Sequence, residues 1–332
     1  MTDTLLLETE TPTGADPTTV AVVGAGSIGI AWSVVYASAG QLVRIWETDE
    51  DRRRTVLEET AAKLGDLLDA GLIDEPIHTV LDRITVSDSL EDALDGARFV
   101  QECVVEDLEV KRALFAELDR LTDLGVVLAS STSTIMASRF AEELAGRERC
   151  LVVHPANPPY FLRVAEIVPA AFTSPAAVAA MRELLERVDI APVVLEREIE
   201  GFVFNRLQGA LLREAYCLVR DGIVTAADID TLVREGLGRR WSLIGPFTTS
   251  ELNTRGGLRR HGELHGPVYA RIGLERAAEN PWTPETVDRV AREIEQQLPH
   301  ESWEENVRER DRAMIRMSSL LRRFDNPLNG RG

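Results

Sequence analysis

The sequence predicts an α/β domain with a doubly wound sheet, followed by an all-helical C-terminal domain. Two observations support this prediction. Between residue 20 and about residue 198, short runs rich in β-branched residues alternate with amphipathic stretches. After Glu200 these runs stop, and long helical patterns take their place. At 332 residues the chain can bury two separate apolar cores, one in each domain.

Composition sets the expected domain boundaries. Residues 1–18 are acidic and rich in Thr and Pro, with no basic start and no apolar segment. We therefore expect a flexible tail there rather than a targeting signal. The α/β domain is expected over residues 19–198 and the helical domain over residues 199–325. Residues 326–332 form a second short tail in this prediction.

Short apolar runs are expected to form the sheet. Most are too short for helices, and their apolar residues are continuous, which is typical of strands buried on both faces of a largely parallel sheet. The runs are Val20–Val23, Leu42–Trp46, Arg83–Val86, Phe99–Cys103, Val126–Ser130, Leu151–His154, Val164–Val168 and Pro192–Leu195. Helix-like stretches such as Asp49–Ala70 and Val110–Leu121 separate them. Helices of the second domain are expected at Val203–Arg220, Ala226–Glu235, Pro267–Ala278, Pro284–Gln297 and Ser302–Arg323.

A glycine-rich motif follows the first predicted strand directly and opens a helix. It consists of Gly24, Gly26 and Gly29, with Ser27 and Ile28 between the last two. The first glycine permits a tight turn, the second lets a pyrophosphate approach the backbone, and the third allows the helix to pack closely on the strand. Free N–H groups at the helix N-terminus would bind the phosphates. In this context the motif predicts a Rossmann-type dinucleotide site, and from the motif alone FAD is the main competitor of NAD.

The second predicted strand is followed by an acid, Glu47. An acid at this position accepts hydrogen bonds from the adenosine ribose hydroxyls and repels a 2′-phosphate, so it favours NAD over NADP. Arg44 lies in the same strand, but side chains alternate in direction along a strand, so we do not expect Arg44 to cover a 2′-phosphate. NAD is therefore the expected cofactor.

Three polar groups lie at the predicted strand ends, where α/β sheets usually place their chemistry. The run from Ser130 to Ser133 follows one strand, His154 ends another, and Glu166 lies within an otherwise apolar strand. A carboxylate among valine and isoleucine side chains is costly unless it is paired, and the imidazole is its obvious partner. Oxidation of an alcohol requires a base for the hydroxyl proton, and an imidazole held in one tautomer by a carboxylate suits this role. His154 and Glu166 are therefore the predicted catalytic pair.

Charge, cysteine content and hydropathy argue against several classes of function. The net charge of −18 argues against nucleic acid as a partner, because phosphate binding requires a basic surface. Three isolated cysteines suit a reducing compartment, and no run approaches the ~18 apolar residues of a membrane span, so we expect a cytoplasmic protein. His261 and His265 are four residues apart, but Gly262 and Gly266 are expected to break the helix there. No metal site is expected.

The chain resembles the 3-hydroxyacyl-CoA dehydrogenase superfamily from residue 19 to about residue 320. The segments that carry the resemblance are GAGSIG, ECVVEDLEVK (102–111), SSTST (130–134), HPANPPY (154–160), the strand residue Glu166 and GFVFNRL (201–207). Within the superfamily the chain is most similar to the λ-crystallin/L-gulonate 3-dehydrogenase branch, with L-carnitine dehydrogenase a near relative. GIVTAADID (222–230) and EGLGRRWSLIGPFTTSELN (235–253) carry this finer likeness.

The resemblance implies the reaction and a set of site residues. The reaction is NAD-dependent oxidation of an L-configured 3-hydroxyl to a ketone. The family's catalytic positions correspond to Ser133, His154, Glu166 and Asn205. Ser133 and Asn205 would hydrogen-bond the substrate oxygen. Glu106 and Lys111 fall where the family contacts the nicotinamide half of NAD, although a solvated charge pair at a helix start explains their spacing equally well.

The resemblance also indicates a small acidic substrate. Arg240 lies in the GLGRRW stretch, which the resemblance places near the active site, and arginine is suited to bidentate capture of a carboxylate. Asn253 is expected to bind a substrate hydroxyl. Arg163, Arg239 and Arg255 depart from the pattern of the branch, either because the substrate is more acidic than gulonate or because they are surface side chains.

Several alternatives remain open at the level of sequence. The substrate of a second candidate reaction is a 3-hydroxyacyl thioester on coenzyme A or a carrier protein, but residues 60–75 offer only Lys63 where the acyl-CoA branch carries several lysines. An L-carnitine-type dehydrogenase is a third possibility, and a non-catalytic, crystallin-like NAD-binding protein is the alternative of another class. A homodimer through the helical domain is expected from its long apolar faces and from the relatives.

Overall fold

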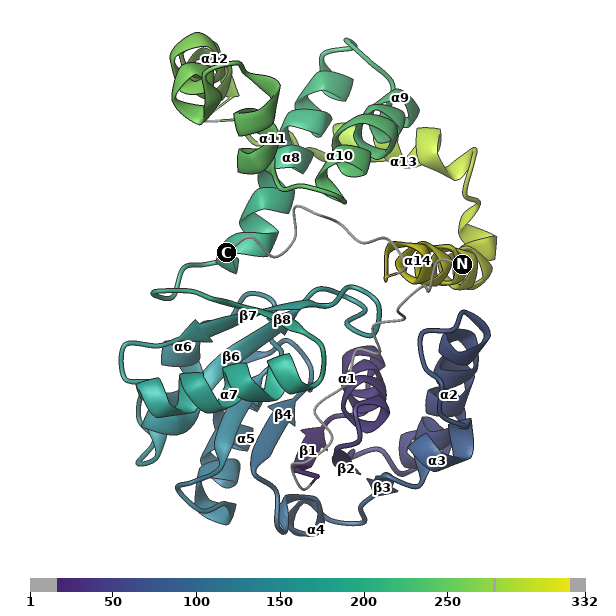
Figure 1. Cartoon of the computed structure of the whole chain (residues 1–332), viewed down its shortest axis with the longest axis vertical. Coiled ribbons are helices and arrows are strands. Elements are labelled where there is room, and N and C mark those ends of the chain that lie inside the picture. The colour runs from purple at the N-terminus through teal and green to yellow at the C-terminus, as the bar shows by residue number, and fades with distance from the viewer. Residues whose placement is uncertain (1–16, 277–278, 323–332) are drawn as a thin grey trace, which may run out of the picture. The chain divides into compact units, whose positions relative to one another are not determined.

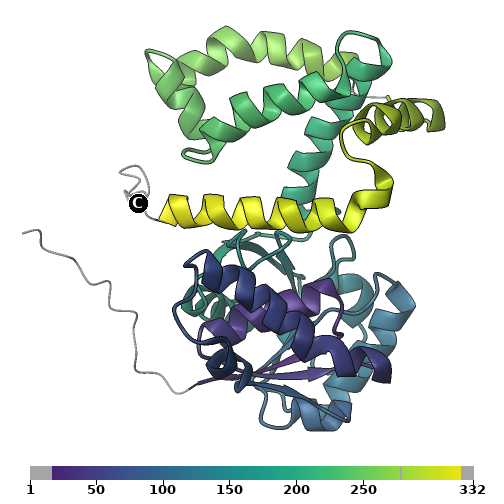
Figure 2. The same ribbon diagram turned by 90° about the vertical axis from the view of Figure 1, so that its right-hand side faces the viewer.

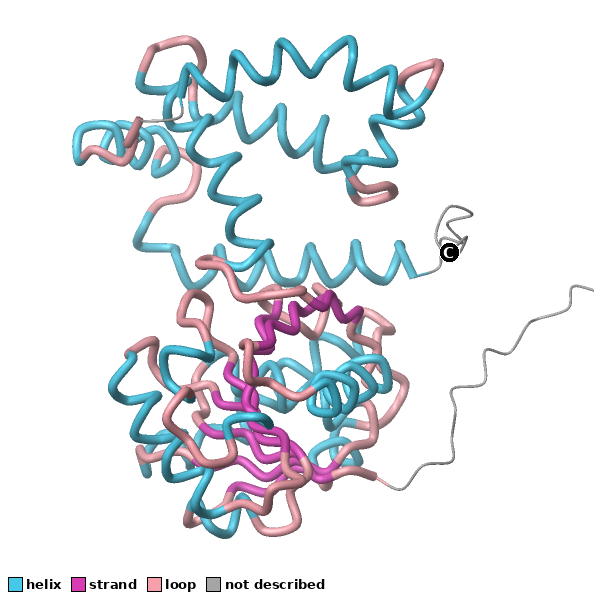
Figure 3. Tube along the Cα trace, turned by 90° about the vertical axis from the view of Figure 1, so that its left-hand side faces the viewer, coloured by secondary structure: helices cyan, strands magenta, loops and turns pink. Residues whose placement is uncertain are grey.

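This computed structural model describes residues 17–276 and 279–322. The chain forms two compact units, which divide between Val203 and Phe204. Figure 3 shows strands in the first unit, while the described part of the second unit is helical. The predicted fold class, a doubly wound α/β domain followed by a helical domain, is confirmed. Most of the tail predicted over residues 1–18, and all of the tail predicted over residues 326–332, lie outside the described residues.

An eight-stranded sheet forms the centre of the first unit, with the strand order β3-β2-β1-β4-β5-β6-β7-β8 (Figure 1). Its strands are β1 (Thr19–Val23), β2 (Leu42–Trp46), β3 (Ile84–Val86), β4 (Phe99–Glu102), β5 (Val127–Ser130), β6 (Cys150–Pro155), β7 (Val164–Pro169) and β8 (Ala191–Val194). Neighbouring strands are parallel, except that β6 and β7 are antiparallel. Each strand closely overlaps one of the predicted apolar runs.

The central strands are buried, as their continuous apolar sequences predict. Every residue of β5 and β6 is buried, and in β1 only Thr19 is partly exposed. Strand β8 differs, because Pro192 is half-buried and its other residues are exposed. The prediction of burial on both faces is therefore wrong for β8, which lies at the edge of the sheet and has a neighbouring strand on one side only.

Helices pack on both faces of this sheet. They are α1 (Ser27–Ser38), α2 (Glu50–Asp69), α3 (Ile77–Leu81), α4 (Leu90–Leu94), α5 (Leu108–Leu121), α6 (Ala137–Ala141) and α7 (Pro175–Arg187). Gly29 of α1 lies against Val22, whereas α4, α5 and α6 share a core with Val23 and Val100 on the opposite face. Helices α1 and α2 pack beside each other (Figure 2).

The strand directions bring the predicted site residues of the first unit to one edge of the sheet. The carboxyl ends of β1, β4, β5 and β6 lie at this edge, and the antiparallel β7 begins there. In the observed register Glu102 lies opposite Ser130, and His154 lies opposite Glu166. The glycine turn after β1 therefore shares an edge with the predicted catalytic pair, as in other doubly wound folds.

The second unit is built from helices joined by short connections. Beginning with α8, which starts just before the division, its elements are α8 (Phe202–Arg220), α9 (Ala226–Leu232), a π-helix (Val233–Gly238), α10 (Arg239–Trp241), α11 (Pro246–Asn253), α12 (Gly257–Arg276), α13 (Pro284–Glu295) and α14 (Trp303–Arg322). None of the described helices combines the length and apolar composition that a bilayer span requires.

Helix α12 corrects one prediction about this unit. Pro267 lies inside the helix rather than at its start, and Gly262 and Gly266 do not interrupt it. A proline removes one helical hydrogen bond, and each glycine costs ~1 kcal/mol relative to alanine. However, α12 packs along α11, and this tertiary contact outweighs the weak local preferences. The predicted end of this helix at Ala278 lies outside the described residues.

Candidate active site

Three glycines shape the turn between β1 and α1, and each meets a different constraint. Gly24 has a φ of 97°, and a Cβ atom there would lie 2.8 Å from the Cys103 carbonyl. At Gly29 a Cβ atom would lie 1.9 Å from the carbonyl oxygen of Gly24. At Gly26 it would have no atom within 4 Å, which leaves the backbone open to a ligand. The turn thus has the shape that a dinucleotide pyrophosphate requires.

The first turn of α1 supplies the donors for such a ligand. Helix α1 begins after Gly26, and no side chain caps its N-terminus within the described ranges. Gly26 and Ser27 are exposed and Ile28 is half-buried, so the turn is accessible. Uncapped N–H groups and the helix dipole favour a phosphate at this position. These residues therefore fit the phosphates of NAD.

Glu47 follows β2 and faces the glycine turn. Its Oε2 accepts a hydrogen bond from the backbone N–H of Ala25 at 2.8 Å. Its Oε1 accepts from the backbone N–H of Asp49 at 3.1 Å and from the hydroxyl of Thr48 at 3.0 Å. Partial burial alone would raise the pKa of Glu47, but these hydrogen bonds lower it below the ordinary 4.5. The ionised carboxylate is suited to accept from ribose hydroxyls and to repel a 2′-phosphate.

His154 and Glu166 form a buried pair across β6 and β7. Nδ1 of His154 lies 2.8 Å from Oε2 of Glu166, and only 6 % and 5 % of the two residues are exposed. The second carboxylate oxygen, Oε1, accepts from the backbone N–H of Val203 at 2.7 Å. Phe202 has a φ of 50°, a conformation that costs about 1–3 kcal/mol in a non-glycine residue and is concentrated at functional sites. The predicted contact between His154 and Glu166 is confirmed.

These contacts determine which imidazole nitrogen carries the proton. An ionised carboxylate only accepts hydrogen bonds, so Nδ1 of His154 must donate to Glu166. In the neutral ring Nε2 then carries the lone pair and is able to take a proton. The pair thus has the arrangement of a general base and its orienting acid.

The loop over residues 130–134 follows β5 and carries Ser133. Its donors converge on the carboxylate of Glu106. Oε1 of Glu106 accepts from the hydroxyl of Thr132 at 2.5 Å and from the backbone N–H groups of Ser133 and Thr134 at 3.0 Å each. Thr132 is buried, whereas Ser133 is exposed. The loop therefore presents Ser133 outward while Glu106 holds its backbone.

Lys111 lies in the first turn of α5, but only 1 % of its side chain is exposed. Its Nζ lies 2.8 Å and 3.0 Å from the carboxylate oxygens of Glu102 and 3.7 Å from Oε2 of Glu106. The alternative interpretation of Glu106 and Lys111 as a solvated charge pair is wrong for Lys111, because its ammonium is buried between two acids. That these two residues contact the nicotinamide half of NAD stays a prediction.

Sequence analysis missed Glu102, which ends β4 and is fully buried. Besides Lys111, the Glu102 carboxylate accepts from the hydroxyl of Ser130 at 2.5 Å and from the backbone N–H of Val104 at 2.7 Å. A signal was available in the sequence, since Glu102 is an acid in an apolar run just as Glu166 is. A buried carboxylate needs partners, and the same reasoning that singles out Glu166 also singles out Glu102.

A second polar network, also missed, lies beneath the Ser133 loop. The Oγ of Ser131 accepts from Nε1 of Trp32 at 3.2 Å and from Nε2 of Gln101 at 2.7 Å. The hydroxyl of Tyr36 donates to Oε1 of Gln101 at 3.1 Å. Trp32 and Tyr36 belong to α1, which begins at the glycine turn. The network therefore ties the helix of the cofactor site to the loop that carries Ser133.

Three predicted site residues lie in the second unit. Asn205 is half-buried in the first turn of α8, whereas Arg240 in α10 and Asn253 at the end of α11 are exposed. Within the described part of the chain, no ion-pair partner contacts the guanidinium of Arg240, whereas that of Arg239 pairs with Glu235 at 2.5 Å. The grouping of these residues with His154 stays a prediction.

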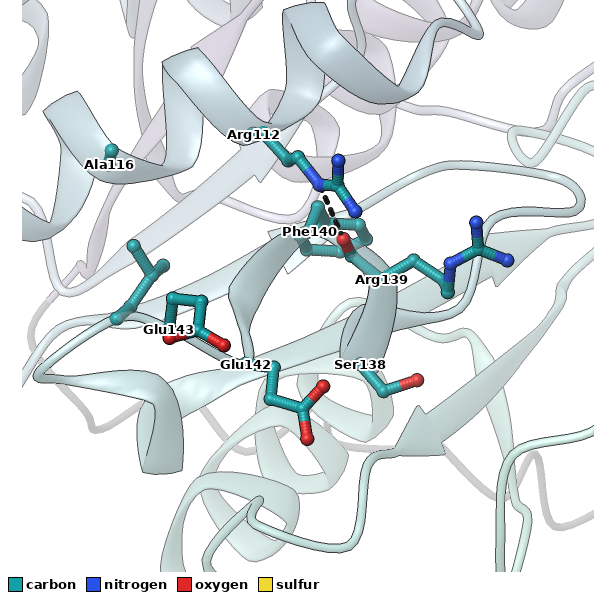
Figure 4. A pocket seen from close by; sticks show the side chains of 8 residues that line it. Arg112, Ala116, Ser138, Arg139, Phe140, Glu142 and Glu143 are labelled. Atoms are coloured by element: carbon teal, nitrogen blue, oxygen red, sulfur yellow. Dashed lines mark hydrogen bonds between the residues drawn. The ribbon is translucent and has the colours of Figure 1, made fainter.

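A surface pocket of about 300 Å³ lies between α5 and α6 (Figure 4). Its lining consists of Arg112, Ala116, Ser138, Arg139, Phe140, Glu142, Glu143 and Leu144. Nε of Arg112 donates to the carbonyl oxygen of Arg139 at 2.8 Å across one side of the pocket. None of the predicted site residues lines this pocket. We therefore place the candidate active site at the sheet edge instead.

A dinucleotide turn and a buried histidine–carboxylate pair at the same edge of the sheet are together typical of NAD-dependent dehydrogenases with a doubly wound sheet. The chain belongs to the 3-hydroxyacyl-CoA dehydrogenase family. The NAD-binding domain of that family matches residues 19–199, and its C-terminal domain matches residues 201–291. The protein is thus an NAD-dependent dehydrogenase that acts on a hydroxyl group.

Individual relatives refine this placement. The chain is similar to the λ-crystallin homolog of Bos taurus, at 40 % identity over 267 residues that cover 79 % of this chain and 83 % of the relative. It is 36 % identical to the L-carnitine dehydrogenase of Streptomyces griseus over 305 residues, 89 % of this chain and 88 % of the relative. The predicted likeness to these two branches is confirmed.

A solved structure confirms the fold over nearly the whole chain. It is that of 5-formyl-3-hydroxy-2-methylpyridine 4-carboxylic acid 5-dehydrogenase, an NAD⁺-dependent dismutase. The TM-score is 0.79 at 22 % identity, and the match covers 92 % of this chain and 99 % of the other. At this identity the comparison shows the fold alone.

Proposed function

We propose that this protein oxidises the L-3-hydroxyl of a small free hydroxy acid to the 3-keto acid, with His154 as the general base. The observation that carries the proposal is the 2.8 Å contact between Nδ1 of His154 and Oε2 of Glu166. This pair lies at the sheet edge that also holds the glycine turn. When bound, NAD supplies the acceptor for the hydride of the alcohol carbon.

The residues of this chain handle the proton of the reaction. Glu166 keeps Nδ1 of His154 protonated, so Nε2 takes the proton of the substrate hydroxyl. The imidazolium that results is stabilised by the buried carboxylate, and in the reverse reaction it returns the proton to the ketone oxygen. Ser133 and Asn205 hydrogen-bond the same oxygen and orient the carbinol carbon. The proposal thus gives each of these four residues one defined contact.

Arg240 supports a free acid as the substrate. Its guanidinium is exposed and has no ion-pair partner among the described residues, and a guanidinium binds a carboxylate in a bidentate manner. The π-helix Val233–Gly238 directly precedes Arg239 and Arg240. π-Helices are rare in proteins, and those that occur often lie at functional sites. Asn253 would bind a further hydroxyl of the substrate. The Streptomyces griseus relative is named for L-carnitine, which is itself a free 3-hydroxy acid.

A 3-hydroxyacyl thioester is the second candidate substrate. It is favoured by a relative from Gibberella moniliformis named 3-hydroxyacyl-CoA dehydrogenase, which is 33 % identical over 90 % of this chain. Against it, Lys63 is the only basic residue that α2 offers between residues 60 and 69 for the phosphates of coenzyme A. A non-catalytic, crystallin-like role would leave the buried His154–Glu166 pair without a function.

NADH formation by the purified protein tests these possibilities. The substrates are L-gulonate, L-carnitine, 3-hydroxybutyrate and 3-hydroxybutyryl-CoA, each with saturating NAD. Turnover of one of the free acids, with the thioester inactive, is the expected result. Turnover of the thioester alone would overturn the free-acid proposal, and NAD binding without any turnover would favour the non-catalytic role.

We also propose that the protein is a cytoplasmic homodimer, assembled through the second unit. Helices α8 and α12 expose large apolar side chains, among them Leu207 at 66 %, Tyr269 at 58 % and Leu274 at 77 %. Such surfaces are uncommon on monomers and are covered by partners. Cys103, Cys150 and Cys217 are free, which suits a reducing compartment. Analytical ultracentrifugation tests the dimer, with Leu274→Glu as the interface variant. The molar mass of the unaltered protein in solution should be twice that of one chain.

A further inference from the structure

The Ser133 loop is organised around one carboxylate oxygen. Oε1 of Glu106 accepts from two backbone N–H groups, those of Ser133 and Thr134, and from two hydroxyls, those of Thr132 and Thr134. All four donor–acceptor distances lie between 2.5 and 3.0 Å. Donors that converge in this way form a cradle for an anion, and here the protein itself supplies the anion.

The charge of Glu106 is matched by a buried cation. Nζ of Lys111 lies 3.7 Å from Oε2 of Glu106, while the same ammonium is held by both oxygens of the fully buried Glu102. Partial burial alone would raise the pKa of Glu106, but the Thr132 hydroxyl and the Lys111 charge lower it below the ordinary 4.5. Near neutral pH the Glu106 carboxylate is therefore ionised, and it fills the cradle with a negative charge.

Both ends of the arrangement are anchored in the sheet. Glu102 ends β4 and accepts from the hydroxyl of Ser130, which ends β5. Lys111 belongs to α5, and Glu106 lies in the connection between β4 and α5. The backbone around Ser133 is thus fixed to two adjacent strands through a chain of charged and hydrogen-bonded groups. Such a chain is sensitive to a change of charge at any of its members.

We propose that Glu106 is a positioning residue: it is the internal anion that orders the loop over residues 130–134 and so places Ser133 for contact with the substrate oxygen. Lys111 and Glu102 hold Glu106 in that position. This inference rests on the proposed role of Ser133 in the function above. It is separate from the predicted contact of Glu106 with NAD, because it concerns the hydrogen bonds that the Glu106 carboxylate accepts from the loop and its charge contact with Lys111.

The inference is tested with Glu106→Ala and added formate. Removal of the side chain empties the cradle, and a displacement of the loop by about 1 Å should reduce kcat/KM by roughly 100-fold. Formate is small enough to occupy the emptied cradle, and 41 % of the Glu106 side chain is exposed, so access is open. We expect formate to restore activity saturably, at least about tenfold, while the Kd of NAD stays within about threefold of the original.

Two further variants make the test specific. Glu106→Gln fills the cradle with a neutral group, so it should lose activity and show no rescue by formate. Glu109→Gln is the matched control, since Glu109 lies three residues further along in the first turn of α5, is exposed and forms its ion pair among the described residues with Arg112. It should retain full activity. His154→Ala in the same assay should lose turnover without rescue by formate.

Two results would overturn the inference. One is a Glu106→Ala variant whose activity formate does not restore, although its thermal unfolding curve shows that the variant is folded. The other is a loss that falls mainly on the Kd of NAD, with kcat unchanged, because that pattern belongs to a cofactor contact. Failure of the proposed function would look different: the unaltered protein would then lack 3-hydroxy acid turnover, or His154→Ala would keep it.

Discussion

Glu166→Gln keeps the shape of this side chain and removes its charge. In the native protein both carboxylate oxygens accept hydrogen bonds, Oε2 from Nδ1 of His154 and Oε1 from the backbone N–H of Val203. A glutamine has one accepting oxygen and one donating amino group, so it cannot serve both partners. If the amino group faces His154, the ring proton moves to Nε2 and the base is lost. If it faces Val203, two buried donors oppose each other.

The expected magnitude follows from these two contacts. A hydrogen bond to a charged group contributes ~1.5–3 kcal/mol, and an unsatisfied buried donor costs a similar amount. At about 1.4 kcal/mol for each factor of ten, the loss of this bond alone reduces kcat roughly 10- to 100-fold. The wrong tautomer also removes the general base, which is usually responsible for about 100- to 10,000-fold. We expect a fall in kcat of about 1,000-fold, with the Kd of NAD nearly unchanged.

The assay is NADH formation at saturating NAD and substrate, with Glu183→Gln as the matched control. Glu183 lies on α7, is exposed and pairs with Arg187 at 2.8 Å, so loss of its charge should leave kcat unchanged. Thermal unfolding of both variants checks that they are folded. A kcat of the folded Glu166→Gln variant within about threefold of the original, less than ~1 kcal/mol, would refute the assigned role of Glu166.

The remaining predictions concern the cofactor and the substrate. Gly29→Ala should lower the free energy of unfolding by ~3 kcal/mol in thermal melts, because its Cβ would lie 1.9 Å from the Gly24 carbonyl oxygen. Gly26→Ala has no atom within 4 Å of its Cβ, so it should melt normally but bind NAD at least about tenfold more weakly by titration calorimetry. Glu47→Ala should weaken NAD binding and reduce the preference of the protein for NAD over NADP. An unchanged preference would mean that another group discriminates between the two cofactors. Because the pKa of Glu47 lies below 4.5, its contribution to NAD binding should be complete above pH 4.5 and be lost as the pH falls through the lowered value. Arg240→Ala should raise KM for an acid substrate much more than for an uncharged analogue, and an equal effect on both would place the carboxylate elsewhere.

Much of the first unit could be predicted because its local signals agree with its tertiary structure. Continuous apolar runs form the strands, which are buried at the centre of the sheet, and the glycine turn has close contacts at Gly24 and Gly29 that no larger residue tolerates. The contact of His154 with Glu166 could be inferred because a buried acid must be paired. The antiparallel register that places the two residues opposite each other could not be predicted, because the sequence of neither strand alone indicates it.

What the sequence did not reveal depends on contacts between distant segments. The hydrogen bond from Trp32 to Ser131 joins residues 99 positions apart, and both side chains have ordinary apolar or small-residue surroundings in the sequence. Lys111 has the sequence pattern of a solvated helix residue, yet the fold buries it against Glu102. The continuation of α12 through Pro267 likewise reflects packing against α11 rather than local preference.

The most direct test of the central claim compares turnover and NAD binding in His154→Ala. NADH formation is measured with the best free 3-hydroxy acid of the substrate panel, and the Kd of NAD is measured on the same preparation. The account predicts that kcat falls by at least about 1,000-fold while the Kd of NAD stays within about twofold, because the imidazole takes the hydroxyl proton and the glycine turn binds the cofactor. A variant that binds NAD and still oxidises the substrate at a comparable rate would show that another group is the base.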